Sequence, residues 1–159
     1  MKAAIRHLIR FINSLEDGLL VVMLTAMVVL AVAQIVWRNF FGAGISWADP
    51  LLRTLVLWVA LSGAVIASRT DNHIHIDFFT RYMPKSWLAP VRRLVFLFSA
   101  AICALIAWHS ARFVRMEYEY GNIAFAGIPA WVTELIIPVG FFLMALRYVL
   151  LFFSPTVKD

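Results

Sequence analysis

The sequence predicts an all-α integral membrane protein, with four transmembrane helices, an amphipathic N-terminal segment and both termini in the cytoplasm. Of its 159 residues, 63% are hydrophobic, and the mean hydropathy is +0.85. A water-soluble domain of this size could not bury that much apolar surface. Four apolar stretches are long enough to cross a bilayer core of about 30 Å, which takes about 20 residues. We therefore expect residues 1–159 to form a single four-helix transmembrane domain.

The N-terminal segment covers residues 1–17. Ile5, Leu8 and Ile12 recur at helical spacing, whereas Lys2 and Arg6 lie elsewhere around the helix. Such a helix can lie in the headgroup plane with its basic face toward anionic lipid. Alternatively, it simply extends the first span, and the sequence leaves both interpretations open.

The four spans cover about residues 19–37, 50–68, 88–112 and 129–153. Basic residues collect at one side of these spans, namely Lys2, Arg6, Arg10, Arg69, Arg81, Lys85, Arg92, Arg93 and Lys158. The other side holds only Arg38, Arg112 and Arg115. Because Lys and Arg concentrate in cytoplasmic loops, both termini and the middle loop are predicted to be cytoplasmic. The net charge of +5 then reflects orientation and contact with membrane lipids, not nucleic acid.

A polar cluster is predicted near the outer surface. Asp49 precedes Pro50, where it can cap the second span, and Arg53 lies one helical turn further on the same face. Glu134 enters the fourth span at about the same depth. Since charges inside a membrane usually pair, Asp49, Arg53 and Glu134 are expected to link the two helices. The alternative is that each side chain snorkels to water independently.

Two further positions stay undecided. Arg147 lies deeper in the fourth span, where it can bind a phospholipid headgroup, snorkel or contact a partner helix. In the middle loop His73, His75 and Asp77 alternate with apolar residues, and in an extended strand this spacing could place three metal ligands on one side. Without a further cluster of ligands, an interfacial loop is the better interpretation. No metal site is predicted.

The spans lack the residues that several membrane chemistries require. There is no pair of histidines at matching depth for haem, and Cys103 is the only cysteine. No carboxylate lies deep within a span, as a stand-alone proton-coupled transporter would need. The sequence therefore predicts no cofactor, no catalytic residue and no enzymatic activity. A membrane anchor for a redox complex and a self-sufficient small transporter remain the rival hypotheses.

Five short motifs follow one another along the chain: "WRNFFG" at the end of the first span, "ISWADPLLR" and "WVALSGAVIASRTDNHIHID" around the second, and "GIPAW" and "PVGFFLMALR" in the fourth. In the order and spacing of these motifs within four spans, the chain resembles the small, DctQ-like membrane subunit of tripartite ATP-independent periplasmic (TRAP) transporters. The resemblance implies a bacterial inner-membrane scaffold for a sodium-coupled transporter of organic acids, such as C4-dicarboxylates or sialic acid. Its implied partners are a large multi-span elevator subunit and a periplasmic substrate-binding protein.

The resemblance also suggests roles for particular residues. The signature and packing positions are Trp47, Trp58, Gly63, Pro129 and Trp131, with Pro129 in the first turn of the last span. His73 and Asp77 belong to the cytoplasmic loop, and Arg115, Glu117 and Glu119 are candidates for docking the binding protein. Pro50 departs from the pattern, because members commonly carry a second acidic residue there. Independently of the resemblance, the residues Pro138, Val139 and Gly140 are expected to kink the fourth helix.

Overall fold

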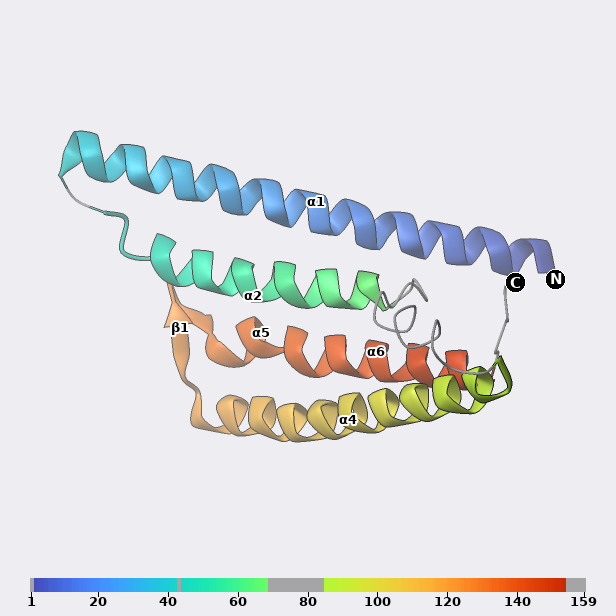
Figure 1. Ribbon diagram of the computed structural model, residues 1–159. Helices are drawn as coiled ribbons and strands as arrows, with labels where there is room; N and C mark the ends of the chain where they lie inside the picture. Colours follow the sequence, from blue (N-terminus) through green and yellow to red (C-terminus); the bar gives the residue numbers. More distant parts are fainter. Residues whose placement is uncertain (1, 43, 69–84, 154–159) are drawn as a thin grey trace.

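The computed structural model describes residues 2–42, 44–68 and 85–153. Its elements are α1 (Lys2–Phe41), α2 (Ala48–Ala67), α4 (Lys85–Tyr120), β1 (Ile123–Phe125), β2 (Ile128–Pro129), α5 (Ala130–Glu134) and α6 (Ile136–Phe153) (Figure 1). Within these residues four helical segments are long and apolar enough to span a membrane: Ile12–Phe41, Ala48–Ala67, Pro90–Tyr120 and Ala130–Phe153. The four-span prediction is confirmed.

The helices lie side by side in an open row. α1 packs on α2, α2 packs on α6, and α6 packs on α4, so α1 and α4 form the two edges (Figure 1). The first residues of α1 and the last residues of α6 lie at one end of the row, which we call the terminal end. The β1–β2 hairpin and the connection from α1 to α2 lie at the other end, which we call the hairpin end.

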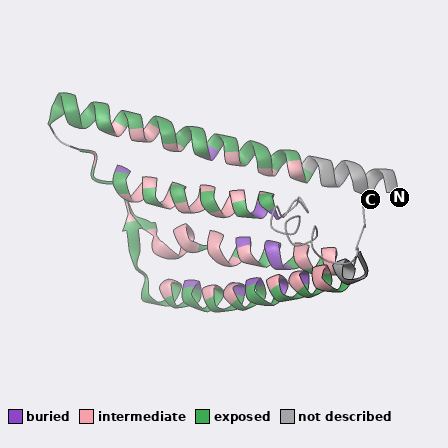
Figure 2. Ribbon diagram, viewed as in Figure 1, coloured by how far each residue is buried: buried purple, intermediate pink, exposed green. Residues whose placement is uncertain are grey.

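An open row leaves most of the apolar surface uncovered. Within the apolar windows of the four spans, only 6% to 17% of the residues are buried, and Figure 2 shows α1 mostly exposed, with intermediate residues recurring along it. Phe40 keeps 77% of its surface exposed, and Val22 keeps 65%. Apolar side chains at this exposure suit a hydrocarbon surrounding, so lipid or a partner protein must cover both faces of the row.

The core lies mainly between α4 and α6. Val65 of α2, Cys103 of α4, and Met144 and Ala145 of α6 form its buried centre. Phe96 is 1% exposed, and its ring stacks 6.5 Å from that of Tyr148. α2 and α6 pack closely at Gly140, where a Cβ atom would lie in van der Waals contact with Leu61 and Val65, 3.7 Å from each, so no larger side chain would fit without a shift. Small residues at such contacts allow close packing of transmembrane helices.

Two helices differ from a simple series of spans. Residues 2–41 form one continuous helix, so the N-terminal segment passes into the first span without a break. The fourth span is interrupted at Leu135, between α5 and α6. Pro138 has no N–H group, which leaves the carbonyl of Glu134 without its helical donor. The expected kink at residues 138–140 stays a prediction, whereas the structure shows an interruption at Leu135, one turn before Pro138.

The β hairpin was not predicted from the sequence. Phe125 pairs with Ile128 across a two-residue turn, in which Ala126 and Gly127 have φ values of 46° and 81°. Two consecutive positive φ angles are typical of the type I′ turn that joins antiparallel strands. Pro129 lies at the N-cap of α5 instead of in its first turn, and the N–H of Ala130 donates to the carbonyl of Asn122 at 2.9 Å.

Candidate functional site

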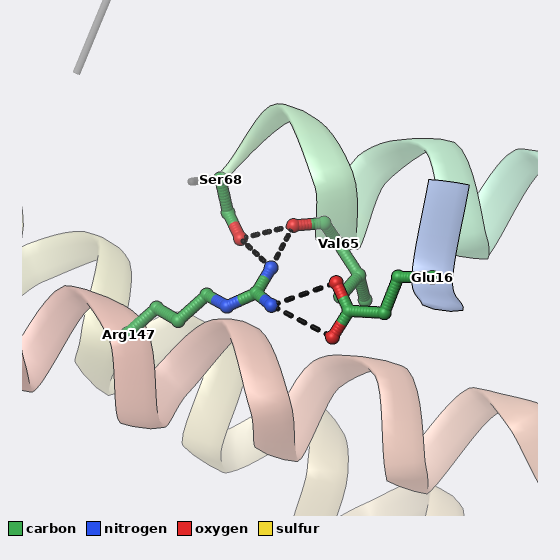
Figure 3. Close-up of polar contacts among 4 residues, drawn as sticks. All are labelled: Glu16, Val65, Ser68 and Arg147. Atoms are coloured by element: carbon green, nitrogen blue, oxygen red, sulfur yellow. Dashed lines mark hydrogen bonds and ion pairs between the residues drawn. The ribbon is translucent and has the colours of Figure 1, made fainter. Parts of the chain in front are cut away.

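Arg147 joins three helices near the terminal end. From α6 its Nη2 donates to both carboxylate oxygens of Glu16 on α1, each at 2.9 Å (Figure 3). Its Nη1 donates to the backbone carbonyl of Val65 on α2 and lies 3.4 Å from Oγ of Ser68. The side chains of Arg147 and Glu16 are only 20% and 22% exposed. The charge is thus neutralised between the helices.

The end of α2 supplies the acceptors for this contact. Val65 lies in the last turn, where backbone carbonyls lack helical donors. Ser68 follows the helix, and its N–H donates to the carbonyl of Ala64 at 3.0 Å, while its hydroxyl donates to the carbonyl of Val65 at 2.6 Å. A cation is also favourable at this end because the helix dipole is negative there. Arg147 therefore acts partly as a C-terminal cap for α2.

This geometry decides among the roles that the sequence left open for Arg147. Its guanidinium is directed toward α1 and α2 of its own chain, with a carboxylate and a carbonyl as acceptors. A buried arginine is tolerated in a membrane when it is paired in this way. We call Glu16, Val65, Ser68 and Arg147 the arginine cluster, and its arrangement fixes the separation of α1, α2 and α6.

The structure does not form the polar cluster predicted at the hairpin end. No hydrogen bond or ion pair joins Asp49, Arg53 and Glu134 within the described residues. Asp49 lies in the first turn of α2, with Trp47 at the N-cap, and it accepts from Nε2 of Gln34 on α1 at 3.1 Å. Arg53 is exposed, and Oε2 of Glu134 is enclosed without a hydrogen bond. The expected link between the second and fourth spans is therefore replaced by a link between the first and second.

Gln34 is the residue that the sequence interpretation missed. Its amide also approaches the carbonyl of Ile45 at 3.5 Å, so it binds both the loop and the start of α2. The sequence does contain a feature that could have predicted this contact, because Gln34 is the only amide or charged side chain between Thr25 and Arg38. A lone amide in an apolar span commonly bonds to a neighbouring helix.

Trp58 links the second and fourth spans instead of the predicted charges. Its Nε1 donates to the carbonyl of Thr133 in α5 at 2.9 Å. Thr133 lies in a five-residue helix, whose terminal carbonyls lack helical donors. The sequence suggested a packing role for Trp58, and the structure adds a hydrogen bond that holds α5 against α2.

The remaining signature positions lie around the hairpin end and along α2. The ring of Trp131 meets Tyr118 edge to face, with centroids 5.6 Å apart. Trp47 is 42% exposed, and Gly63 has open space where a Cβ atom would lie. His73 and Asp77 lie outside the described residues.

The candidate docking residues lie on the last turns of α4. Nε of Arg115 donates to Oε1 of Glu119 at 3.0 Å, with side-chain exposures of 82% and 59%. Oε2 of Glu117 accepts from Asn122, at the start of the hairpin, at 2.8 Å. These groups form a charged surface beside the hairpin. Within the described part of the chain, no three His, Cys, Asp or Glu side chains are grouped as metal ligands.

Comparison with known proteins identifies a matching family. Residues 27–156 match the family described as "Tripartite ATP-independent periplasmic transporters, DctQ component". This region includes all of α2, α4 and α6 and the second half of the first span.

Individual relatives agree with this match. The C4-dicarboxylate TRAP transporter small permease protein DctQ of Rhodobacter capsulatus is 30% identical over 123 residues, which are 74% of this chain and 52% of that protein. The sialic acid TRAP transporter small permease protein SiaQ of Vibrio cholerae is 24% identical over 147 residues, 90% of this chain and 82% of SiaQ. The sialic acid TRAP transporter permease protein SiaT of Haemophilus influenzae is 33% identical over 76 residues, 48% of this chain but only 12% of SiaT.

Proposed function

The chain belongs to the family of DctQ components of TRAP transporters and is a multi-pass protein of the bacterial inner membrane, and from this we propose that it is a non-catalytic small permease subunit. Its transporter would be sodium-coupled, would depend on a periplasmic binding protein and would move an organic acid. The match over residues 27–156 carries this proposal. Relatives named for C4-dicarboxylate and for sialic acid suggest the substrate class.

We propose that the chain scaffolds a large multi-span subunit. The open row supports this role, because it presents two apolar faces that its own helices do not cover. The match to 12% of SiaT indicates that a similar segment forms part of a much larger permease in that relative. The arginine cluster and the Gln34–Asp49 bond hold α1, α2 and α6 in one arrangement. A rigid surface of this kind suits a static support for a moving partner.

The proposed orientation places the hairpin end in the periplasm and both termini in the cytoplasm. The excess of Lys and Arg on the terminal side supports it. The surface around Arg115, Glu117 and Glu119 would then face the binding protein, and His73 and Asp77 would face the cytoplasm. Arg53, exposed on α2 and unbonded among the described residues, is proposed to face the large subunit.

Reconstitution tests the scaffold proposal directly. Liposomes that contain this chain alone should show no sodium-driven uptake of C4-dicarboxylate or sialic acid. Liposomes that also contain the large subunit and the binding protein should show uptake of the transporter's own substrate. Flux through the chain alone, or an absorption spectrum that reveals a bound prosthetic group, would refute the proposed role.

Assembly can be tested at Arg53. Arg53→Ala should lower the yield of large subunit that co-purifies with the chain, and should leave the affinity of the binding protein for its ligand unchanged. Arg93→Ala is the matched control, because Arg93 is also exposed but lies at the terminal end of α4. Equal yields from the two variants would contradict the assignment of Arg53 to this interface.

The docking surface is tested by charge reversal. Arg115→Glu and Glu119→Lys should each weaken docking of the binding protein, more strongly at low salt. Their pair is highly exposed, so stability should change by at most about 1 kcal/mol. The double variant restores the pair within the chain but inverts the charges toward the partner. It should therefore still dock weakly, and wild-type docking in all three variants would argue against this surface.

A further inference from the structure

An apolar groove lies between α4 and the α5–α6 segment. It encloses about 620 Å³. On α4 it is lined by small side chains, including Ala104, Ala107 and Ala111, and on the opposite side by Leu135, Pro138 and Phe142. The alanines leave space that larger residues would fill. The interruption of the fourth span lies along the opposite wall.

The position of this groove in the bilayer follows from the charges of α4. No Asp, Glu, Lys or Arg occurs between Arg93 and Arg112, and 19 residues of helix extend about 28 Å, close to the bilayer core of about 30 Å. Arg112 therefore lies at the headgroup level of the hairpin end. The groove extends along α4 from Val114 to Ala104, and Ala104 lies about 12 Å deeper than Arg112. This depth corresponds to most of one leaflet.

An exposed indole lines the groove, and a cation lies one helical turn from it on α4. Arg112 is exposed and makes no hydrogen bond or ion pair in the described part of the chain. Trp108 lines the groove, is 68% exposed and lies one turn from Arg112 on the same side of α4. Tryptophan is typical of the headgroup level. Arg115, the next arginine along α4, is less suited to bind an anion than Arg112, because it is already paired with Glu119.

We propose that this groove binds a phospholipid. Its phosphate bonds to the guanidinium of Arg112, and one acyl chain lies along the alanines from Ala111 to Ala104. Arginine suits this role because its planar donors match phosphate oxygens. A phospholipid supplies an anion and a narrow apolar chain in one molecule. A partner helix is about 10–12 Å wide and would still need an anion level with Arg112. The proposal extends beyond the small-permease role and does not depend on it.

Three probes distinguish the contribution of the phosphate, bound by Arg112, from that of the acyl chain, bound by the groove. The full-length protein is purified in detergent, and binding is measured by native mass spectrometry. The probes are phosphatidylglycerol, a diacylglycerol with the same chains, and glycerol 3-phosphate. Phosphatidylglycerol should bind at least tenfold more tightly than either of the others, because only it offers both phosphate and chain. Equal binding of phosphatidylglycerol and diacylglycerol would overturn the role of Arg112.

Matched variants locate the binding. Arg112→Gln should weaken phosphatidylglycerol binding about tenfold, as expected for loss of one charged hydrogen bond, whereas Arg38→Gln, at the hairpin end of α1, should not. Ala104→Phe fills the groove and should also weaken binding. Leu105→Phe adds the same ring outside the groove, at a residue that is 61% exposed, and should leave binding unchanged.

Two results would overturn the proposal. Equal effects of each variant and its control would show only non-specific lipid around the helices. Cross-linking of the large subunit to position 111 in the assembled transporter, with no phosphatidylglycerol retained, would assign the groove to a partner helix. Neither result would alter the flux measurements that test the small-permease role, so the two failures are distinguishable.

Discussion

Replacing Arg147 by methionine should destabilise the protein more than any other single change at the terminal end. The substitution keeps an apolar stem of similar length and removes the guanidinium that contacts Glu16 at 2.9 Å and the carbonyl of Val65. Removing one partner of a fully buried ion pair costs about 3–5 kcal/mol. Because about a fifth of each side chain is exposed here, we expect about 2–3 kcal/mol.

A double-mutant cycle isolates the ion pair itself. Glu16→Gln keeps a hydrogen-bond acceptor for Arg147 but leaves its charge uncompensated, so it should cost about 2 kcal/mol. The double variant, Glu16→Gln with Arg147→Met, should cost less than the sum of the single variants by at least about 1 kcal/mol, since the residues are in direct contact. Arg147→Lys should be intermediate, because an ammonium cannot reproduce the forked contacts to Glu16 and Val65.

The measurement is the free energy of unfolding in mixed micelles, followed by circular dichroism as the denaturing detergent is increased. Arg93→Met serves as the control, because it removes an exposed arginine from the same end of the row. Strictly additive losses for Glu16 and Arg147 would refute the reasoning. So would an Arg147→Met variant as stable as the control.

Further changes test other contacts by the same unfolding measurement. Trp58→Phe should cost about 1–2 kcal/mol, because it leaves the carbonyl of Thr133 without its donor; no loss would show that this bond is dispensable. Ala126→Gly should stabilise the hairpin by about 1 kcal/mol, because Ala126 has a positive φ, and Ala126→Val should do the opposite. Gly140→Ala should be nearly neutral, since its Cβ atom would lie 3.7 Å from Val65, whereas Gly140→Ile should cost about 1–3 kcal/mol by overpacking. An equal response to alanine and isoleucine would contradict close packing there.

Helix number and apolar character could be predicted from the sequence because each depends on local runs of residues. The four spans need only length and hydropathy, and the expectation of a kink at residues 138–140 needs only the missing N–H group of Pro138. Neither inference requires knowledge of which helices are neighbours. The hairpin was missed because Ala126 is an unusual residue for a type I′ turn, which normally contains Asn, Asp or Gly.

The polar contacts could not be predicted in the same way, because they depend on the order of helices in the row. Arg147 finds Glu16 at a separation of 131 residues, and nothing in the local sequence connects them. Asp49 and Arg53 have suitable spacing for a pair on one helix, yet Gln34 of the adjacent α1 binds Asp49 instead. Spacing within one helix thus predicts a possible pair, whereas the neighbouring helix decides whether it forms.

The unbroken course of α1 decides how its first turns leave the membrane. Between Asp17 and Arg38 the helix carries no charged residue, and these 20 residues extend about 30 Å, which matches the bilayer core. The helix nevertheless begins at Lys2, so residues 2–17 continue for about 24 Å beyond that core. A helix without a break cannot both cross the core and lie flat in the headgroup plane. The first four turns therefore project from the membrane as a stiff rod within reach of proteins outside the bilayer.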